Sequence, residues 1–172
     1  MKTTGVTRKI DELGRIVIPK EIRRNLGIRD GESLEIFIEN ESIVLKKHNQ
    51  MNSYEELGNM LCSTIASLLD ISIIITDREK IICTDESLKN LKNKKIDQKL
   101  VNLIDNRENY ESQIYEILNI EETVIEGFLT IYPIISSIDS LGLVVIVSKI
   151  RKNYFIFAKL VANFLVGNIN IE

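Results

Sequence analysis

The first 48 residues alternate short apolar and polar runs, a pattern that predicts strands joined by turns around one short helix. Pro19 ends an expected strand and suits the first position of a helix over 20–26, because a helix needs no backbone N–H there. Gly27 suits the C-cap of the same helix. The predicted order is β, β, α, β, β, with strands at 5–11, 15–18, 34–38 and 42–47.

The predicted helix has a narrow apolar stripe formed by Ile22 and Leu26, and Arg23 and Arg24 fall outside this stripe. A unit of about 48 residues buries little apolar surface, so it usually needs a disulfide, a metal or a partner chain for stability. The sequence shows no disulfide framework and no metal-binding motif in this unit. We therefore expect the unit to oligomerise, and pairing would also cover exposed strand edges.

After a polar linker over 47–53, a second pattern predicts a larger domain over 54–172. At both ends of this domain apolar residues recur every three or four positions, as in helices, and runs of β-branched residues typical of strands lie between them. In the first helix, Leu57, Leu61, Ile65 and Leu68 indicate the buried side. The predicted class is α+β with an antiparallel sheet. Helices are expected at 54–69, 96–105 and 154–167, and strands at 71–76, 81–84, 113–118, 127–135 and 141–148.

The charge of the chain is unevenly distributed. Its 172 residues are 44% hydrophobic and 27% charged with a formal net charge of −3, as in an ordinary globular protein. Residues 1–29 carry eight lysines and arginines against three acids, a net charge of +5. Residues 51–172 carry 12 lysines and arginines against 17 acids, a net charge of −5. A basic N-terminal segment on an acidic body predicts polyanion binding at one place in the molecule.

Few residues suit catalysis or metal binding. Cys62 and Cys83 stand 21 residues apart with no histidine near them, so we expect buried apolar side chains rather than zinc ligands or a disulfide. The single histidine, His48, lies in the polar linker, where a solvated side chain is expected instead of a catalytic base. The sequence contains no phosphate-binding GxxxxGK[ST] loop and no G-x-S-x-G elbow. We expect no enzyme activity, no cofactor and no bound metal.

The apolar runs are short. Runs such as 141–147 fall far below the roughly 18 residues that a membrane-spanning helix needs. The N-terminus lacks the apolar core and the cleavage site of a secretory signal. We therefore expect a cytoplasmic protein without membrane contact.

The run from Thr4 to Ile28, TGVTRKIDELGRIVIPKEIRRNLGI, resembles the DNA-binding domain of the AbrB family of transition-state regulators. The likeness continues through 30–31, 34–36 and 45–47. This resemblance implies that residues 1–50 form a swapped-hairpin β-barrel homodimer that binds double-stranded DNA. Residues 54–172 resemble an appended GAF-type domain, which implies ligand sensing or assembly. The combination implies a role in the forespore of a spore-forming bacterium.

Carried over to this sequence, the DNA-contacting positions of that family are Arg8, Arg15, Arg23 and Arg24, with Lys9 as a helper. Arginine suits the role because its planar guanidinium can grip a phosphate or a guanine edge with two hydrogen bonds. Strict alternation would place Arg8 on the apolar face of its strand, from which a bulge or a strand end would release it. The alternative is a solvated basic surface with local ion pairs such as Glu21 with Arg24.

The GAF-type half lacks a cyclic-nucleotide signature, a histidine for haem and a recognisable chromophore cysteine. A pocket for an unidentified small molecule stays open, and its residues cannot be named from the sequence. The last helix carries only Lys159 and Asn163 as strongly polar positions between 154 and 166. Such a helix predicts either burial between the sheet and the helix over 54–69, or pairing with other subunits into a homotetramer.

These features bear on three functions of different classes. The first is a DNA-binding transcription regulator of sporulation genes with a sensory or assembly domain. The second is an antitoxin-like DNA-binding protein with a partner-binding C-terminal domain. Such antitoxins generally end in a short flexible tail, whereas the residues beyond 50 have a folded pattern. The third is an enzyme in which residues 1–50 serve only for oligomerisation. No catalytic motif supports an enzyme. We expect the first.

Overall fold

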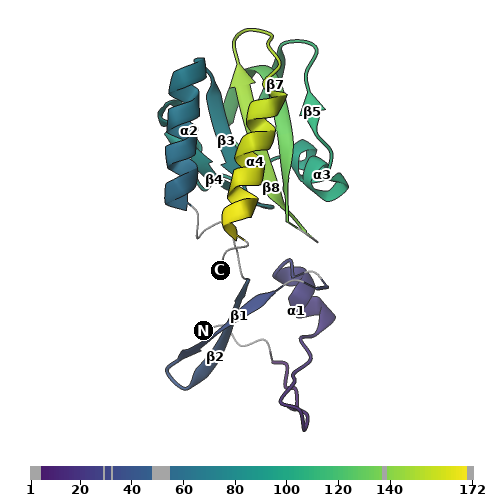
Figure 1. Cartoon of the computed structure of the whole chain (residues 1–172). Helices are drawn as coiled ribbons and strands as arrows, with labels where there is room; N and C mark the ends of the chain where they lie inside the picture. Colours follow the sequence, from purple (N-terminus) through teal and green to yellow (C-terminus); the bar gives the residue numbers. More distant parts are fainter. Residues whose placement is uncertain (1–4, 29, 32, 48–54, 137–138, 170–172) are drawn as a thin grey trace. The chain divides into compact units, whose positions relative to one another are not determined.

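The computed structural model describes residues 5–28, 30–31, 33–47, 55–136 and 139–169, and it divides the chain into two compact units (Figure 1). Unit 1 is Met1–His48 and unit 2 is Asn49–Glu172. Most of the predicted linker, including His48, lies outside the described residues.

Unit 1 contains one short helix and one hairpin. Helix α1 is Lys20–Asn25, and strands β1 (Leu34–Glu39) and β2 (Ser42–Lys47) pair in antiparallel fashion. The two-residue turn of the hairpin has positive φ at Asn40 (46°) and Glu41 (62°), as the right-handed twist of a tight hairpin favours. The helix and both of these strands confirm the sequence prediction.

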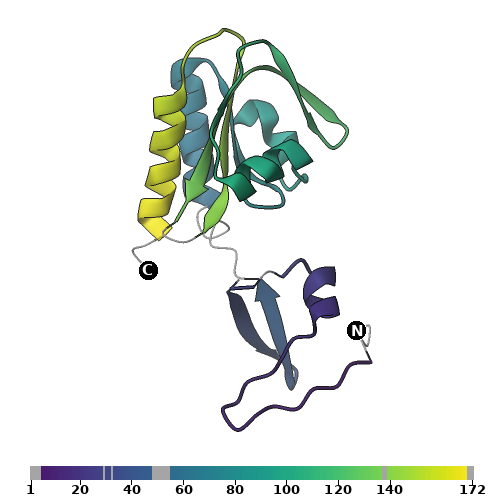
Figure 2. The same cartoon turned by 90° about the vertical axis from the view of Figure 1, so that its right-hand side faces the viewer.

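The strands predicted at 5–11 and 15–18 are wrong for the single chain. The described residues before α1 form a long loop whose only regular feature is one turn (Figure 2). In that turn the Gly14 N–H donates to the Asp11 carbonyl at 2.9 Å, and the Asp11 N–H donates to the Arg15 carbonyl at 3.1 Å. A strand requires a hydrogen-bonded neighbouring strand, and among the described residues, those at 5–18 belong to neither sheet.

Helix α1 also departs from its prediction in part. Gly27 takes positive φ (62°) and the Ile28 N–H donates to the Arg23 carbonyl at 2.7 Å, which confirms the expected C-terminal closure. Pro19 precedes the helix as its N-cap rather than occupying its first position. The predicted buried stripe is wrong, because Leu26 is 59% exposed. No described residue of unit 1 is fully buried, so the described part of a single copy has no core.

Unit 2 is an α+β domain built on one antiparallel sheet with the strand order β4-β3-β8-β7-β5, and β6 also pairs with β7. Figures 1 and 2 show α2 and α4 side by side on one face of this sheet and α3 on the other. The helical elements are α2 (Glu55–Leu69), the 3₁₀ helix η2 (Glu86–Leu91), α3 (Gln98–Asn106) and α4 (Phe155–Ile169). The strands are β3 (Ser72–Thr76), β4 (Ile81–Thr84), β5 (Tyr110–Glu111), β6 (Glu116–Ile120), β7 (Thr123–Ile135) and β8 (Ser140–Ser148).

The sheet has an apolar core on each face. Under α2 and α4 the core includes Ile73, Ile75, Val144 and Val161, and under α3 a second core contains residues such as Ile74 and Leu100. Alternate residues of β3 therefore face opposite cores, which explains why this strand reads as a continuous apolar run. The central strands approach closely at Gly142, where an added Cβ would lie 1.8 Å from the Thr76 carbonyl oxygen.

Both cysteines are buried in the core under α2, as expected. Burial raises the pKa of the Cys83 thiol to about 12, and burial raises the pKa of the Cys62 thiol further above its usual range. Protonated, enclosed thiols are poor nucleophiles and poor metal ligands. These side chains therefore act as small apolar residues.

The buried side of α2 is confirmed in part. Leu61 and Ile65 pack against the core as predicted, and Gly58 and Cys62 are buried, whereas Leu68 is 77% exposed. The reason is a close approach: an added Cβ at Gly58 would lie 2.4 Å from the Cys83 Sγ, so the glycine turns towards the sheet and Leu68 turns away. The 3₁₀ helix η2 and the short β5 were not predicted, and β7 begins four residues earlier than expected. Among the described helices, none is long and apolar enough to cross a membrane.

Candidate nucleic-acid interface

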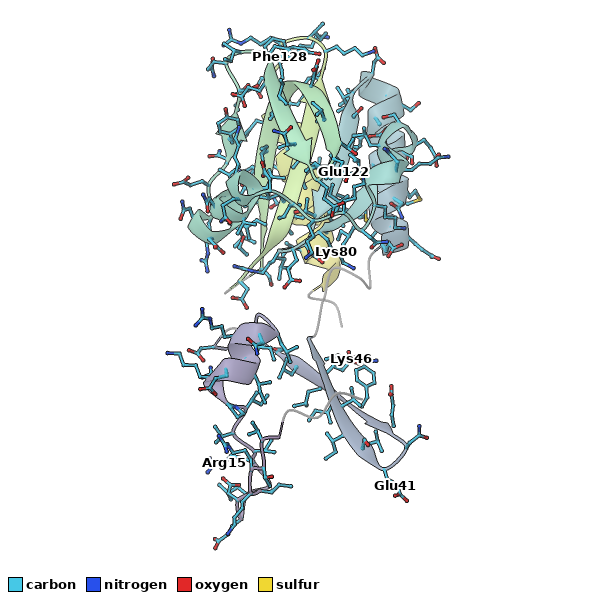
Figure 3. All side chains as sticks on the ribbon, turned by 180° about the vertical axis from the view of Figure 1, so that it is seen from behind. Arg15, Glu41, Lys46, Lys80, Glu122 and Phe128 are labelled. Atoms are coloured by element: carbon cyan, nitrogen blue, oxygen red, sulfur yellow. The ribbon has the colours of Figure 1, made fainter. Side chains whose placement is uncertain are left out.

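The five basic residues predicted to contact DNA all lie on unit 1. Arg8, Lys9 and Arg15 belong to the loop that precedes α1, where Figure 3 labels Arg15, and Arg23 and Arg24 belong to α1 itself. Four of them are exposed, and the Arg23 side chain is about one-third exposed. The apolar face expected to bury Arg8 does not form, because its segment is a loop.

Arg15 is held by the turn on which it lies. Its Nε–H donates to the Asp11 Oδ2 at 2.8 Å, and its backbone N–H donates to the Asp11 Oδ1 at 2.8 Å. The Leu13 N–H donates to the same Oδ1 at 3.0 Å. The backbone N–H and then the guanidinium of Arg15 hold the pKa of the Asp11 carboxyl below its ordinary value. The Arg15 side chain is nevertheless 72% exposed.

The other basic side chains have fewer partners. Arg23 donates through Nη1 to the Asp30 carboxylate, and Arg8 donates through Nη1 to the Thr7 carbonyl at 3.0 Å. No hydrogen bond or ion pair within the described residues engages the side chains of Lys9 or Arg24. The ion pair between Glu21 and Arg24 that the sequence suggests does not form among the described residues. Lys9 and Arg24 are therefore available to an anionic ligand.

Asp11 and Asp30 were missed by the sequence reasoning. The alternation predicts a strand that ends at Asp11, although an aspartate followed three residues later by Gly14 is typical of a turn closed by its own carboxylate. In such a turn, a side chain four residues after the aspartate lies near the carboxylate, as Arg15 does. Asp30 had no comparable signal, because its contact with Arg23 depends on how the chain leaves α1.

Unit 2 offers an open hollow of about 440 Å³ beside α2 and η2, lined in part by Ser63, Ala66, Asp85, Val147 and Lys149. The Asp85 carboxylate in this hollow accepts hydrogen bonds from the Ile73 N–H at 2.8 Å and the Ser87 N–H at 2.9 Å. These contacts attach η2 to β3. Across the part of the chain that the structure describes, no group of three histidines, cysteines or acids is placed to hold a metal ion.

Comparisons with known proteins cover both units. The family model for the C-terminal domain of stage V sporulation protein T, a transcription factor, matches residues 53–168. The model for the MazE bacterial antitoxin, described as antidote-toxin recognition, matches residues 7–52.

Two curated relatives come from Bacillus subtilis (strain 168). Stage V sporulation protein T is 36% identical over 155 residues, which are 87% of this chain and 86% of the relative. The transition state regulatory protein AbrB is 46% identical over 70 residues, which are 41% of this chain and 65% of the relative. The resemblance of residues 4–47 to the AbrB family is thereby confirmed.

A solved structure, the cofactor binding GAF domain of the nutrient sensor CodY from Clostridium difficile, aligns with 70% of this chain and 93% of its own. The identity is 13% and the TM-score is 0.48. The α+β class with antiparallel sheets is confirmed by the structure itself, and the finer GAF assignment stays a prediction.

Proposed function

This chain belongs to the family of stage V sporulation protein T, and on that premise we propose that it is a non-enzymatic transcription regulator that binds double-stranded DNA through unit 1. The observation that carries the proposal is the set of exposed basic side chains on the loop before α1 and on α1. Residues 1–29 have a net charge of +5 in a chain whose total charge is −3. Its target genes are those of sporulation in the forespore.

The salt dependence of DNA affinity tests this electrostatic part of the proposal. If a dimer neutralises about six phosphates, the logarithm of the association constant should fall with the logarithm of salt concentration at a slope of about −5. Fluorescence anisotropy of the full chain on a labelled random-sequence duplex measures the slope. A polypeptide of residues 55–172 is the control and should not bind. A slope near zero for the full chain would contradict the proposal.

Unit 1 binds DNA as a homodimer in this proposal, with the swapped-hairpin barrel of the AbrB family. The support is apolar surface: a single copy leaves large side chains exposed on the loop, on α1 and on both strands. A second copy would cover these side chains and supply strand partners for 5–11 and 15–18. The most exposed of them are Ile10, Leu13, Val17, Ile36, Ile38 and Ile43.

Unit 2 assembles these dimers into a homotetramer through α4. One side of the helix is buried against the sheet at Ala158, Val161 and Leu165. On the other side Ile156, Leu160 and Phe164 recur every four residues and form an exposed apolar stripe, with Ile156 at 75% and Leu160 at 56% exposure. The alternative, burial of the whole helix within one chain, is contradicted by the exposure of Ile156 and Leu160. Pairing with α4 of another subunit would remove this stripe from water.

Leu160→Glu is expected to reduce the tetramer to dimers, and so is Phe157→Glu, whose side chain is 40% exposed on α4 one residue after Ile156. Each change places a charge in or beside the proposed helix interface. Binding should weaken more for DNA with two sites than for DNA with one, since two linked unit 1 dimers bind two sites with higher avidity. Light scattering and binding assays on the full chain measure both effects. Lys152→Glu, an exposed position before α4, is the matched control. A native protein that is dimeric at tens of micromolar would refute the tetramer.

An antitoxin-like function is the second candidate, since the MazE model matches residues 7–52. That reading would require the C-terminal part to wrap around a toxin. Unit 2 instead has its own sheet with a buried core on each face. We therefore favour assembly, with ligand sensing by unit 2 as an added expectation of the GAF-type resemblance.

A further inference from the structure

Asp11 makes more contacts than a surface aspartate needs. Its Oδ1 accepts the backbone N–H groups of Leu13 and Arg15, which closes the turn, and its Oδ2 accepts the Nε–H of Arg15. The two oxygens of one carboxylate therefore have separate tasks. One fixes the backbone and the other fixes the side chain of Arg15.

The contact between Arg15 and Asp11 leaves the two Nη groups of the guanidinium available for a ligand. Because Asp11 occupies Nε, the two Nη groups at the end of the guanidinium have no partner among the residues that the structure describes. These groups form the planar fork that grips a phosphate or the O6 and N7 atoms of guanine. Arg23 differs, because Asp30 already occupies its Nη1.

Asp11 has two opposing effects on an anionic ligand. Its charge repels phosphates, which would weaken binding. Its contact restricts the rotamers of Arg15 before binding, which lowers the entropy that the arginine loses on contact with DNA. The repulsion is small because the carboxylate is already neutralised by a guanidinium and two backbone N–H groups. The lowered pKa of Asp11 agrees with this neutralisation.

We propose that Asp11 is a positioning residue that holds Arg15 with its Nη fork presented for bidentate contact with DNA. This inference rests on the proposed function and assigns a specific task to one acidic residue within the basic surface. Removing the negative charge of Asp11 should therefore weaken specific binding, although simple electrostatics predicts tighter binding.

Asp11→Asn tests the proposal with little change of shape. The asparagine Oδ1 can still accept the backbone N–H groups, while an NH₂ group replaces the oxygen that accepts from Arg15 Nε. With a duplex selected by the native full chain from a random library, affinity should fall about fivefold to tenfold, a size set by the rotamer freedom returned to one arginine per chain. Glu12→Gln, the exposed neighbour with the same change of charge, is the control and should bind as tightly as the native chain or tighter.

A double-mutant cycle with Arg15→Ala separates positioning from a merely structural role. If Asp11 acts through Arg15, Asp11→Asn should change affinity less than about twofold in the Arg15→Ala background. An equal loss in both backgrounds, or unchanged or tighter binding by Asp11→Asn alone, would overturn the proposal. The thermal midpoint of each variant checks folding.

A measurement without DNA tests the role of Asp11 separately from the proposed DNA-binding function. The ¹⁵Nε–H signal of Arg15 should show restricted motion in the native chain and free motion in Asp11→Asn, measured by the heteronuclear Overhauser effect. If the native chain selects no duplex at all, the proposed function fails while this measurement still reports on the Asp11 contact. If the native chain selects DNA and the Arg15 signal is equally mobile in both proteins, the positioning inference alone fails.

Discussion

Leu26→Asp is expected to abolish both the association and the fold of a polypeptide of residues 1–50. In the single chain Leu26 is mostly exposed, although it continues the apolar side of α1 that begins at Ile22. If dimerisation buries this side chain, the variant brings two carboxylates into a small apolar interface, which costs several kcal/mol per dimer, on the order of the whole stability of so small a unit.

Sedimentation equilibrium and thermal unfolding measure this effect. The native polypeptide should sediment as a dimer, and its unfolding midpoint should rise with protein concentration, because folding and association are linked. Asn25→Asp makes the same change of charge at an exposed polar position one residue earlier and should remain dimeric. A native polypeptide that is a folded monomer at micromolar concentration would contradict the dimer.

Replacing both Arg23 and Arg24 by alanine is expected to weaken DNA binding by at least about 100-fold. Each arginine contact is worth about 1.4 kcal/mol or more, which is about tenfold in affinity, and every chain loses two. The loss should be accompanied by a shallower salt dependence, since fewer phosphates are neutralised. Fluorescence anisotropy over a range of salt concentrations measures both quantities.

The control for this double variant removes two charges from the acidic unit. Lys149→Ala with Lys152→Ala takes away two exposed lysines that lie outside unit 1, and affinity should stay within about twofold of the native value. Sedimentation of both proteins checks that assembly is intact. Full DNA affinity in the Arg23→Ala, Arg24→Ala protein would remove these two residues from the interface.

Features that depend on local sequence were predicted well. The hairpin of β1 and β2 follows from alternation on both sides of Asn40 and Glu41, and the end of α1 follows from Gly27, which takes the positive φ that the closure requires. Strands β4 and β8 also lie where their apolar runs indicate. Each of these signals is complete within a few neighbouring residues.

Features that depend on distant contacts were not predictable in the same way. The strands expected over 5–18 join no sheet among the described residues, so their apolar alternation is not explained by a pairing within that part of the chain. The orientation of α2 depends on the contact of Gly58 with Cys83, 25 residues away. No periodicity in the helix itself reveals that contact.

In the candidate site, too, the features set by local sequence were predictable and those set by contacts between separate segments were not. The arginines were identified from their order along the chain, because a continuous family motif fixes their positions. Their orientation was not predictable, since it depends on carboxylates brought close by a turn at Asp11 and by the path of the chain to Asp30. Sequence patterns therefore predict which side chains contact DNA, and the structure adds how Arg15 is held.

The arginine side-chain ¹⁵Nε–H spectrum of the full chain, recorded during titration with duplex DNA, tests the central claim most directly. It compares the arginines of the two units within one protein. The account predicts that Arg8, Arg15, Arg23 and Arg24 shift and that the shifts reverse with salt, while Arg78, Arg107 and Arg151 of unit 2 stay unchanged. Shifts confined to unit 2, or DNA binding that leaves Arg8, Arg15, Arg23 and Arg24 unperturbed, would contradict it.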